Sequence, residues 1–172
     1  VEDRVYVFTP DGDVVDLPSG STPLDFAYYV HTNVGHRCIG AKVFNRIVPF
    51  TYQLKTGDQI EIITGKEPNP KRDWVNPNLD YVHSYRARAK IQTWFKQQDK
   101  EKNIIEGKQM VERELNRLDI PWSETSHAVE RFNMNSIDDL LAAIGAGDVR
   151  LYQVINFIES KATNQPKPEI DP

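Results

Sequence analysis

The chain is poor in cysteine and lacks long apolar runs. Cys38 is the only cysteine among 172 residues, so neither an internal disulfide nor a thiolate metal cluster can form. No stretch approaches the roughly 20 apolar residues that a membrane-spanning helix needs. The charged start, residues 1–8, does not have the pattern of a secretory signal. We therefore expect a cytoplasmic protein, and the missing initiator methionine suggests that the sequence begins inside a longer chain.

The common catalytic and metal-binding motifs are also missing. The sequence has no GxxxxGK[ST] loop, no GxGxxG and no HExxH. His31 and His36 lie five residues apart, but two imidazoles are fewer ligands than zinc sites use. Cys38 lies near His36 without a motif that would make it a nucleophile. We expect no catalysis, no metal and no cofactor in this chain.

Charge is unevenly distributed along the chain. The formal net charge is −4, yet residues 71–96 contain six basic and two acidic residues, a local charge of +4. Four of these basic residues fall on one expected helix: Arg86, Arg88, Lys90 and Lys96. Such a stripe is either a solvated helix face or a set of phosphate contacts, and the residue pattern leaves both readings open.

Strand and turn patterns dominate the first third of the chain. Five β-prone segments alternate with turn residues, at 5–9, 14–17, 39–44, 47–49 and 59–64. A short helix over 23–31 begins with Thr22 as a cap, Pro23 in the first turn and Asp25 three residues after the cap. Strands of one sheet around a single helix form the β-grasp arrangement seen in ubiquitin. The pattern predicts this fold for residues 1–66.

The remainder of the chain changes to a helical period. Proline and glycine between residues 65 and 77 predict an irregular linker over 67–80. Ser84 can cap a helix whose apolar face includes Ile91 and Phe95. Further helices are expected over 104–118, 124–132 and 137–144, and from Asp148 onward. Ser136 and Asp139 form a capping box for the helix over 137–144. We predict an α+β chain in which an all-α domain over 81–161 precedes a disordered tail, 162–172.

The segment HTNVGHRCIG, residues 31–40, is expected to be a loop after the short helix, and it concentrates groups that suit an unpaired RNA end. The imidazole of His31 and the guanidinium of Arg37 can stack on bases, and Gly35 lets the backbone approach a ligand closely. An ordinary helix end also explains this pattern, because an imidazole near the last carbonyls is electrostatically favourable. Residue chemistry alone leaves the choice open.

Residues 5–64 resemble a TGS domain, which occurs in threonyl-tRNA synthetase, a group of GTPases and SpoT. The resemblance rests on FTPDGDV, LPSGSTPLDFAY, VGHRCIGAK and LKTGDQIEI taken together. The segments PNPKRDWVNPNLDYVHSYRARAKIQTWFKQQDK and DDLLAAIGAGDVRL resemble the helical regulatory domain of bacterial RelA/SpoT-type (p)ppGpp synthetases, closer to RelA than to SpoT. This likeness implies a β-grasp TGS domain followed by an all-helical domain.

The resemblance also implies a role in the stringent response. In that family the TGS domain contacts the 3′-CCA end of deacylated tRNA in the ribosomal A site, and the helical domain lies between tRNA and large-subunit rRNA. Binding there activates a separate synthetase domain, a GTP pyrophosphokinase. The implied contacts with the CCA end are His31, Thr32, Gly35, His36, Arg37 and Lys42. The implied contacts with the RNA backbone are Arg86, Arg88, Lys90 and Lys96.

Three other functions compete with tRNA sensing. TGS domains of SpoT-like relatives resemble docking sites for acyl carrier protein, although Asp11, Asp13, Asp16 and Asp25 leave this domain without a notably basic surface. A threonyl-tRNA synthetase would continue into an editing domain, whereas amphipathic helices follow here. A purely intramolecular restraint of the synthetase domain can coexist with tRNA sensing as two states biased by one ligand.

Overall fold

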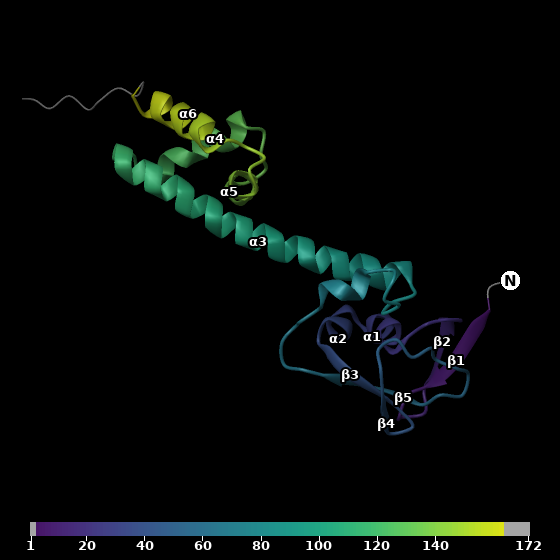
Figure 1. Ribbon diagram of the computed structural model, residues 1–172. Helices are drawn as coiled ribbons and strands as arrows, with labels where there is room; N and C mark the ends of the chain where they lie inside the picture. The colour runs from purple at the N-terminus through teal and green to yellow at the C-terminus, as the bar shows by residue number, and fades with distance from the viewer. Residues whose placement is uncertain (1–2, 164–172) are drawn as a thin grey trace, which may run out of the picture. The chain divides into compact units, whose positions relative to one another are not determined.

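The computed structural model describes residues 3–163 and divides into two compact units between Phe95 and Lys96 (Figure 1). The first unit contains all the described strands and the second is helical, which confirms the predicted α+β class. Within the described residues, no helix has the length and apolar character needed to cross a membrane.

Five strands form the framework of the first unit. β1 (Arg4–Phe8) and β2 (Val14–Pro18) form an antiparallel hairpin. β3 (Cys38–Val43) lies between β4 (Arg46–Val48) and β5 (Ile60–Thr64), antiparallel to both. A parallel bridge from Phe8 to Gln59 joins the two sets. The predicted strands are confirmed, with small shifts at their ends.

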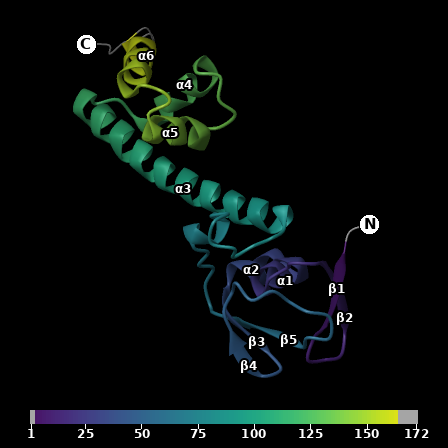
Figure 2. The same cartoon turned by 45° about the vertical axis from the view of Figure 1, so that its right-hand side comes forward.

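Two helices cover one face of this framework (Figures 1 and 2). α1 (Pro23–Val30) begins with the predicted capping box between Thr22 and Asp25. The expectation of an irregular loop after residue 31 is wrong, because α2 (Thr32–His36) follows at once. His31 ends α1 and starts α2, and its imidazole accepts a hydrogen bond from the backbone of Asn33. A histidine is not a usual helix cap, so sequence patterns did not indicate this turn.

The segment expected to be an irregular linker packs into the first unit. It contains a 3₁₀ helix, η1 (Arg72–Val75), whose Trp74 is 3% exposed and meets Phe50 edge to face. The backbone N–H of Asn69 donates to the carbonyl of His36 at 2.9 Å. Apolar burial overrides the proline content here, and the first unit extends to Phe95, beyond the boundary expected at residue 66.

The prediction of two helices between residues 84 and 118 is wrong. A single helix, α3 (Tyr85–Leu118), covers this range. The apolar stripe is interrupted over residues 96–103, which suggested a break, but six of these eight residues are lysine, glutamine or glutamate, which favour helices, and none is proline or glycine. Interruption of the stripe therefore marks a change of environment along the helix and not its end.

The second unit packs shorter helices against the later part of α3. They are η2 (Trp122–Thr125), α4 (Ser126–Arg131), α5 (Ile137–Ala146) and α6 (Leu151–Thr163). Ser136 caps α5 as predicted, while the helix expected over 124–132 is a 3₁₀ turn followed by α4. Gly107 and Gly145 let α3 and α5 approach so closely that a Cβ on either would overlap the backbone of the other helix. Residues 162 and 163, expected in the tail, are helical, and the rest of that tail lies outside the described residues.

Candidate functional site

His31 occupies the junction of α1 and α2 with its side chain exposed. Its Nδ1 accepts a hydrogen bond of 2.9 Å from the backbone N–H of Asn33. Its own carbonyl accepts from Gly35 N–H at 3.1 Å. Because Nδ1 is an acceptor, the neutral ring carries its proton on Nε2. The junction thus presents an oriented imidazole with a donor directed away from its capping bond. Thr32, the next residue, is half-buried as the first residue of α2.

Gly35 and His36 both pack against Tyr28 of α1, which is 1% exposed. Any Cβ on Gly35 would overlap the Tyr28 ring. The Tyr28 hydroxyl lies 3.0 Å from Nδ1 of His36, and the two rings meet edge to face at 5.3 Å. Packing against Tyr28 within the protein therefore explains why position 35 is a glycine.

The imidazole of His36 lies between α1 and α3. Its ring centre is 6.1 Å from that of Trp94 on α3. Burial, followed by the positive charge of Lys90, lowers the pKa of His36 from its ordinary value. The ring is half-buried and favours the neutral form, so it serves as packing and as a hydrogen-bond partner of Tyr28.

Arg37 and Lys42 do not join His31 in one exposed cluster. The Nε of half-buried Arg37 donates to the carbonyl of Gly65 at 2.8 Å, which ties the end of α2 to the end of β5. Lys42 lies four residues beyond Cys38 on β3, about 13 Å along the strand at the usual rise per residue. There it pairs in register with Ile47 and Glu61.

The predicted basic stripe on α3 separates into three environments. Arg86 is exposed, and Lys90, one turn later, donates from Nζ to the carbonyl of Tyr28 at 3.2 Å. Burial and then the charge of Arg86 lower the pKa of Lys90. Arg88 is half-buried, and its Nε has no hydrogen-bond partner among the described residues. Lys96 is exposed at the start of the second unit. The structure therefore brings Lys90 to the helix end that carries His31.

Cys38, at the start of β3, is buried with 3% exposure. Its Sγ lies 3.6 Å from the carbonyl oxygen of Gly40. Burial raises the pKa of this thiol to about 11, while the contact with Gly40 acts in the opposite direction. The thiol stays protonated near neutral pH, which does not suit a nucleophile.

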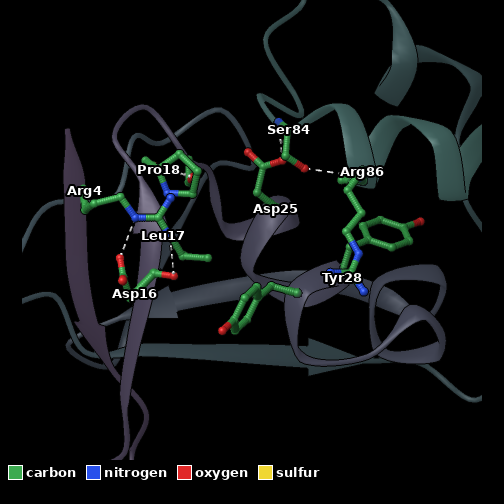
Figure 3. A pocket seen from close by; sticks show the side chains of 11 residues that line it. Arg4, Asp16, Leu17, Pro18, Asp25, Tyr28, Ser84 and Arg86 are labelled. Atoms are coloured by element: carbon green, nitrogen blue, oxygen red, sulfur yellow. Dashed lines mark hydrogen bonds and ion pairs between the residues drawn. The ribbon is translucent and has the colours of Figure 1, made fainter. Parts of the chain in front are cut away.

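A cleft that the sequence did not indicate lies beside α1 and is lined in part by Tyr28 and Tyr29 (Figure 3). Its volume is about 210 Å³, and it lies between the end of β2, α1 and the first turns of α3. Arg4, held by Asp16 through a 2.7 Å ion pair, lines one side, and Arg86 lines the other. Apolar parts of Leu17, Pro18, Tyr28, Tyr29 and Ala87 form much of the remaining wall. One flat or apolar group could enter beside the Arg86 guanidinium.

The cleft exists because Asp25 brings the start of α3 onto α1. Its carboxylate accepts from the backbone N–H groups of His83 and Ser84 at 2.8 and 3.0 Å. It also accepts from the N–H of Thr22 at 2.9 Å. The sequence indicated the local cap but carried no signal for the two donors some 58 residues away.

Family comparisons agree with this architecture. Residues 5–64 match the TGS domain, and residues 94–159 match the RelA/SpoT AH domain. The chain is a RelA/SpoT-type pair of TGS and AH domains. His31, Gly35 and Arg37 lie within the TGS match, whereas Arg86 and Lys90 lie in the segment between the two matches.

Several curated relatives share both domains. The chain is 62% identical to GTP pyrophosphokinase of Escherichia coli K12, over 98% of this chain and 23% of that protein. It is 57% identical to GTP pyrophosphokinase of Haemophilus influenzae, over 99% of this chain and 23% of the relative. A probable guanosine-3′,5′-bis(diphosphate) 3′-pyrophosphohydrolase of Synechocystis is 38% identical, over 96% of this chain and 22% of that protein. The TGS and AH pair thus spans about a quarter of the length of these relatives.

Proposed function

We propose that this TGS and AH pair regulates a (p)ppGpp synthetase by sensing deacylated tRNA in the ribosomal A site. The names of the relatives support a link to GTP pyrophosphokinase activity. The pair itself is proposed to be non-catalytic, with the synthetase domain elsewhere in the parent chain. In this role it binds the unpaired 3′-CCA end through the TGS domain and contacts rRNA or tRNA backbone through basic residues.

The observation that supports the proposal best is the pose of His31. Among the residues expected to touch the CCA end, His31 combines an exposed ring with an orientation fixed by the Asn33 N–H. An exposed, pre-oriented ring can stack on an unpaired base or donate from Nε2 to it at a low entropic cost. Base–aromatic stacking contributes on the order of 1–3 kcal/mol per base.

The other residues expected at this site take different parts in the proposal. Gly35, His36 and Arg37 shape the junction through their contacts with Tyr28 and Gly65. Exposed Arg86 supplies a phosphate contact near the end of α1. An amino acid esterified to the terminal ribose would clash with the packed junction of α1 and α2, so that only the deacylated end fits.

The test is a titration of the protein with a CCA-ended RNA minihelix, followed by NMR chemical shifts. We expect shifts centred on residues 31–37 with the deacylated RNA and not with its aminoacylated form. His31→Glu should weaken binding at least tenfold, because it removes the ring and adds a charge that repels phosphate.

The matched control is His127→Glu, which makes the same change at an exposed histidine of the second unit. It should leave binding to the CCA end unchanged. In the full-length protein, ribosome-dependent (p)ppGpp synthesis should fail with His31→Glu and survive with His127→Glu. Wild-type binding or activation in the His31→Glu protein would show that the proposal is wrong.

A further inference from the structure

Tyr28 connects three helices of the first unit. Its carbonyl accepts a hydrogen bond from Lys90 of α3 at 3.2 Å. Its hydroxyl lies 3.0 Å from Nδ1 of His36 on α2. Its ring fills the space beside Gly35 so closely that no side chain fits there. Both the main chain and the side chain of this one residue are therefore held in place.

His31 lies between the parts that Tyr28 holds together. Its backbone N–H bonds to the carbonyl of Ala27 at 3.2 Å in the last turn of α1. Its imidazole Nδ1 bonds to the first turn of α2. The imidazole keeps its orientation only while these two turns keep theirs.

Lys90 is placed to hold the last turn of α1. A cation near the carbonyl end of a helix is stabilising, and its hydrogen bond satisfies one of the carbonyls left unpaired there. Lys90 is half-buried, unlike exposed Arg86 one turn earlier. One further turn along α3, Trp94 packs against the His36 ring. The start of α3 thus contacts both helices that meet at His31.

We propose that Lys90 is a positioning residue, which holds the Tyr28 carbonyl and thereby fixes the His31 imidazole for RNA recognition without itself contacting phosphate. This inference rests on the proposed function of the junction. It replaces the expectation that Lys90 is a backbone contact. It also makes the first turns of α3 part of the recognition site.

The test compares Lys90→Met with Arg86→Met, two substitutions that remove the same charge from one face of α3. A direct phosphate contact contributes about 0.7–0.9 to the slope of log affinity against log salt. Arg86→Met should reduce this slope by about that amount. Lys90→Met should weaken binding of the CCA-ended minihelix about tenfold and leave the slope unchanged.

A second measurement needs no RNA. Nitrogen-15 NMR of the free protein reports which ring nitrogen of His31 carries the proton. Lys90→Met should reduce the population with the proton on Nε2, whereas Lys90→Arg and Arg86→Met should preserve it. If Lys90→Met fails to fold, Lys90→Ala takes its place, because it also removes the amino group that holds the Tyr28 carbonyl and alanine favours the helix. It should shift the His31 signals in the same direction.

The outcomes separate the two proposals. A Lys90→Met protein with a reduced salt slope and unchanged His31 signals would make Lys90 a phosphate contact and overturn the inference. Unchanged affinity in that variant would also overturn it. If the wild-type protein does not bind the minihelix, the proposed function fails, and the ring signals of the free protein still decide whether Lys90 positions His31.

Discussion

Gly35 packs directly against the Tyr28 ring at the junction of α1 and α2. A methyl group at this position would overlap the Tyr28 ring, and overpacking of this kind typically costs about 1–3 kcal/mol. We expect Gly35→Ala to lower the free energy of unfolding by that amount, measured by urea denaturation. Gly40→Ala is the matched control, because its methyl group would make only an ordinary contact with Ile63. Equal losses in the two variants would contradict this account.

The neutral state of His36 makes stability depend on pH. Burial lowers its pKa in the folded protein below the ordinary value of 6.5. Between these two pKa values the unfolded chain binds more protons, so the free energy of unfolding falls as pH drops below about 6.5. Above that pH the contribution of His36 to the free energy of unfolding is constant. We expect His36→Gln to show a shallower loss of stability between pH 7 and pH 5, measured by denaturation at each pH.

His83→Gln provides the comparison for this pH series. His83 is exposed, and its contact with Asp25 is made by its backbone N–H, which the substitution preserves. Because this substitution leaves the contacts of His36 in place, the loss of stability that depends on His36 should remain in this variant. A profile of His36→Gln parallel to that of the wild type would show that His36 does not titrate as inferred.

At the scale of elements, one carboxylate caps two helix starts. Asp25 completes the capping box of α1 and accepts from the two backbone N–H groups that precede α3. Each lost cap typically costs about 0.5–2 kcal/mol, so Asp25→Ala should lower the free energy of unfolding by about 1–4 kcal/mol. Thermal or urea denaturation measures this loss. Asp16→Ala, which removes an exposed ion pair with Arg4, should cost at most about 1 kcal/mol.

Local patterns predicted the elements whose causes are local. The Thr22 and Ser136 caps, the five strands and the class of the second unit follow from spacing and turn residues. The turn α2 depends on a histidine cap and on packing against Tyr28, which no spacing rule includes. The cleft and the bond from Lys90 to Tyr28 join residues about sixty positions apart, so only the folded chain shows them.

At the scale of the whole molecule, the first unit needs the residues that follow the TGS match. Trp74, Val82, Ala87 and Ile91 form one buried cluster with Leu24 and Tyr28 of α1. A protein ending at residue 66 would expose this side of α1, at about 1.5–3 kcal/mol for each large apolar side chain left uncovered. We expect residues 1–95 to unfold cooperatively, and residues 1–66 to be several kcal/mol less stable. Circular dichroism melting of the two truncated proteins measures the difference, and equal melting temperatures would contradict the prediction.

The burial of Cys38 allows its thiol to report on local opening of the protein. A thiol-modifying reagent can reach Sγ only when the start of β3 opens, and no second thiol competes for it. The labelling rate of the native protein, divided by that of the denatured chain, gives the equilibrium constant for this opening when closing is fast. Cys38 directly follows the segment from His31 to Arg37. Slower modification of this thiol upon addition of RNA would therefore show that RNA binds at the junction of α1 and α2, and no engineered probe is needed.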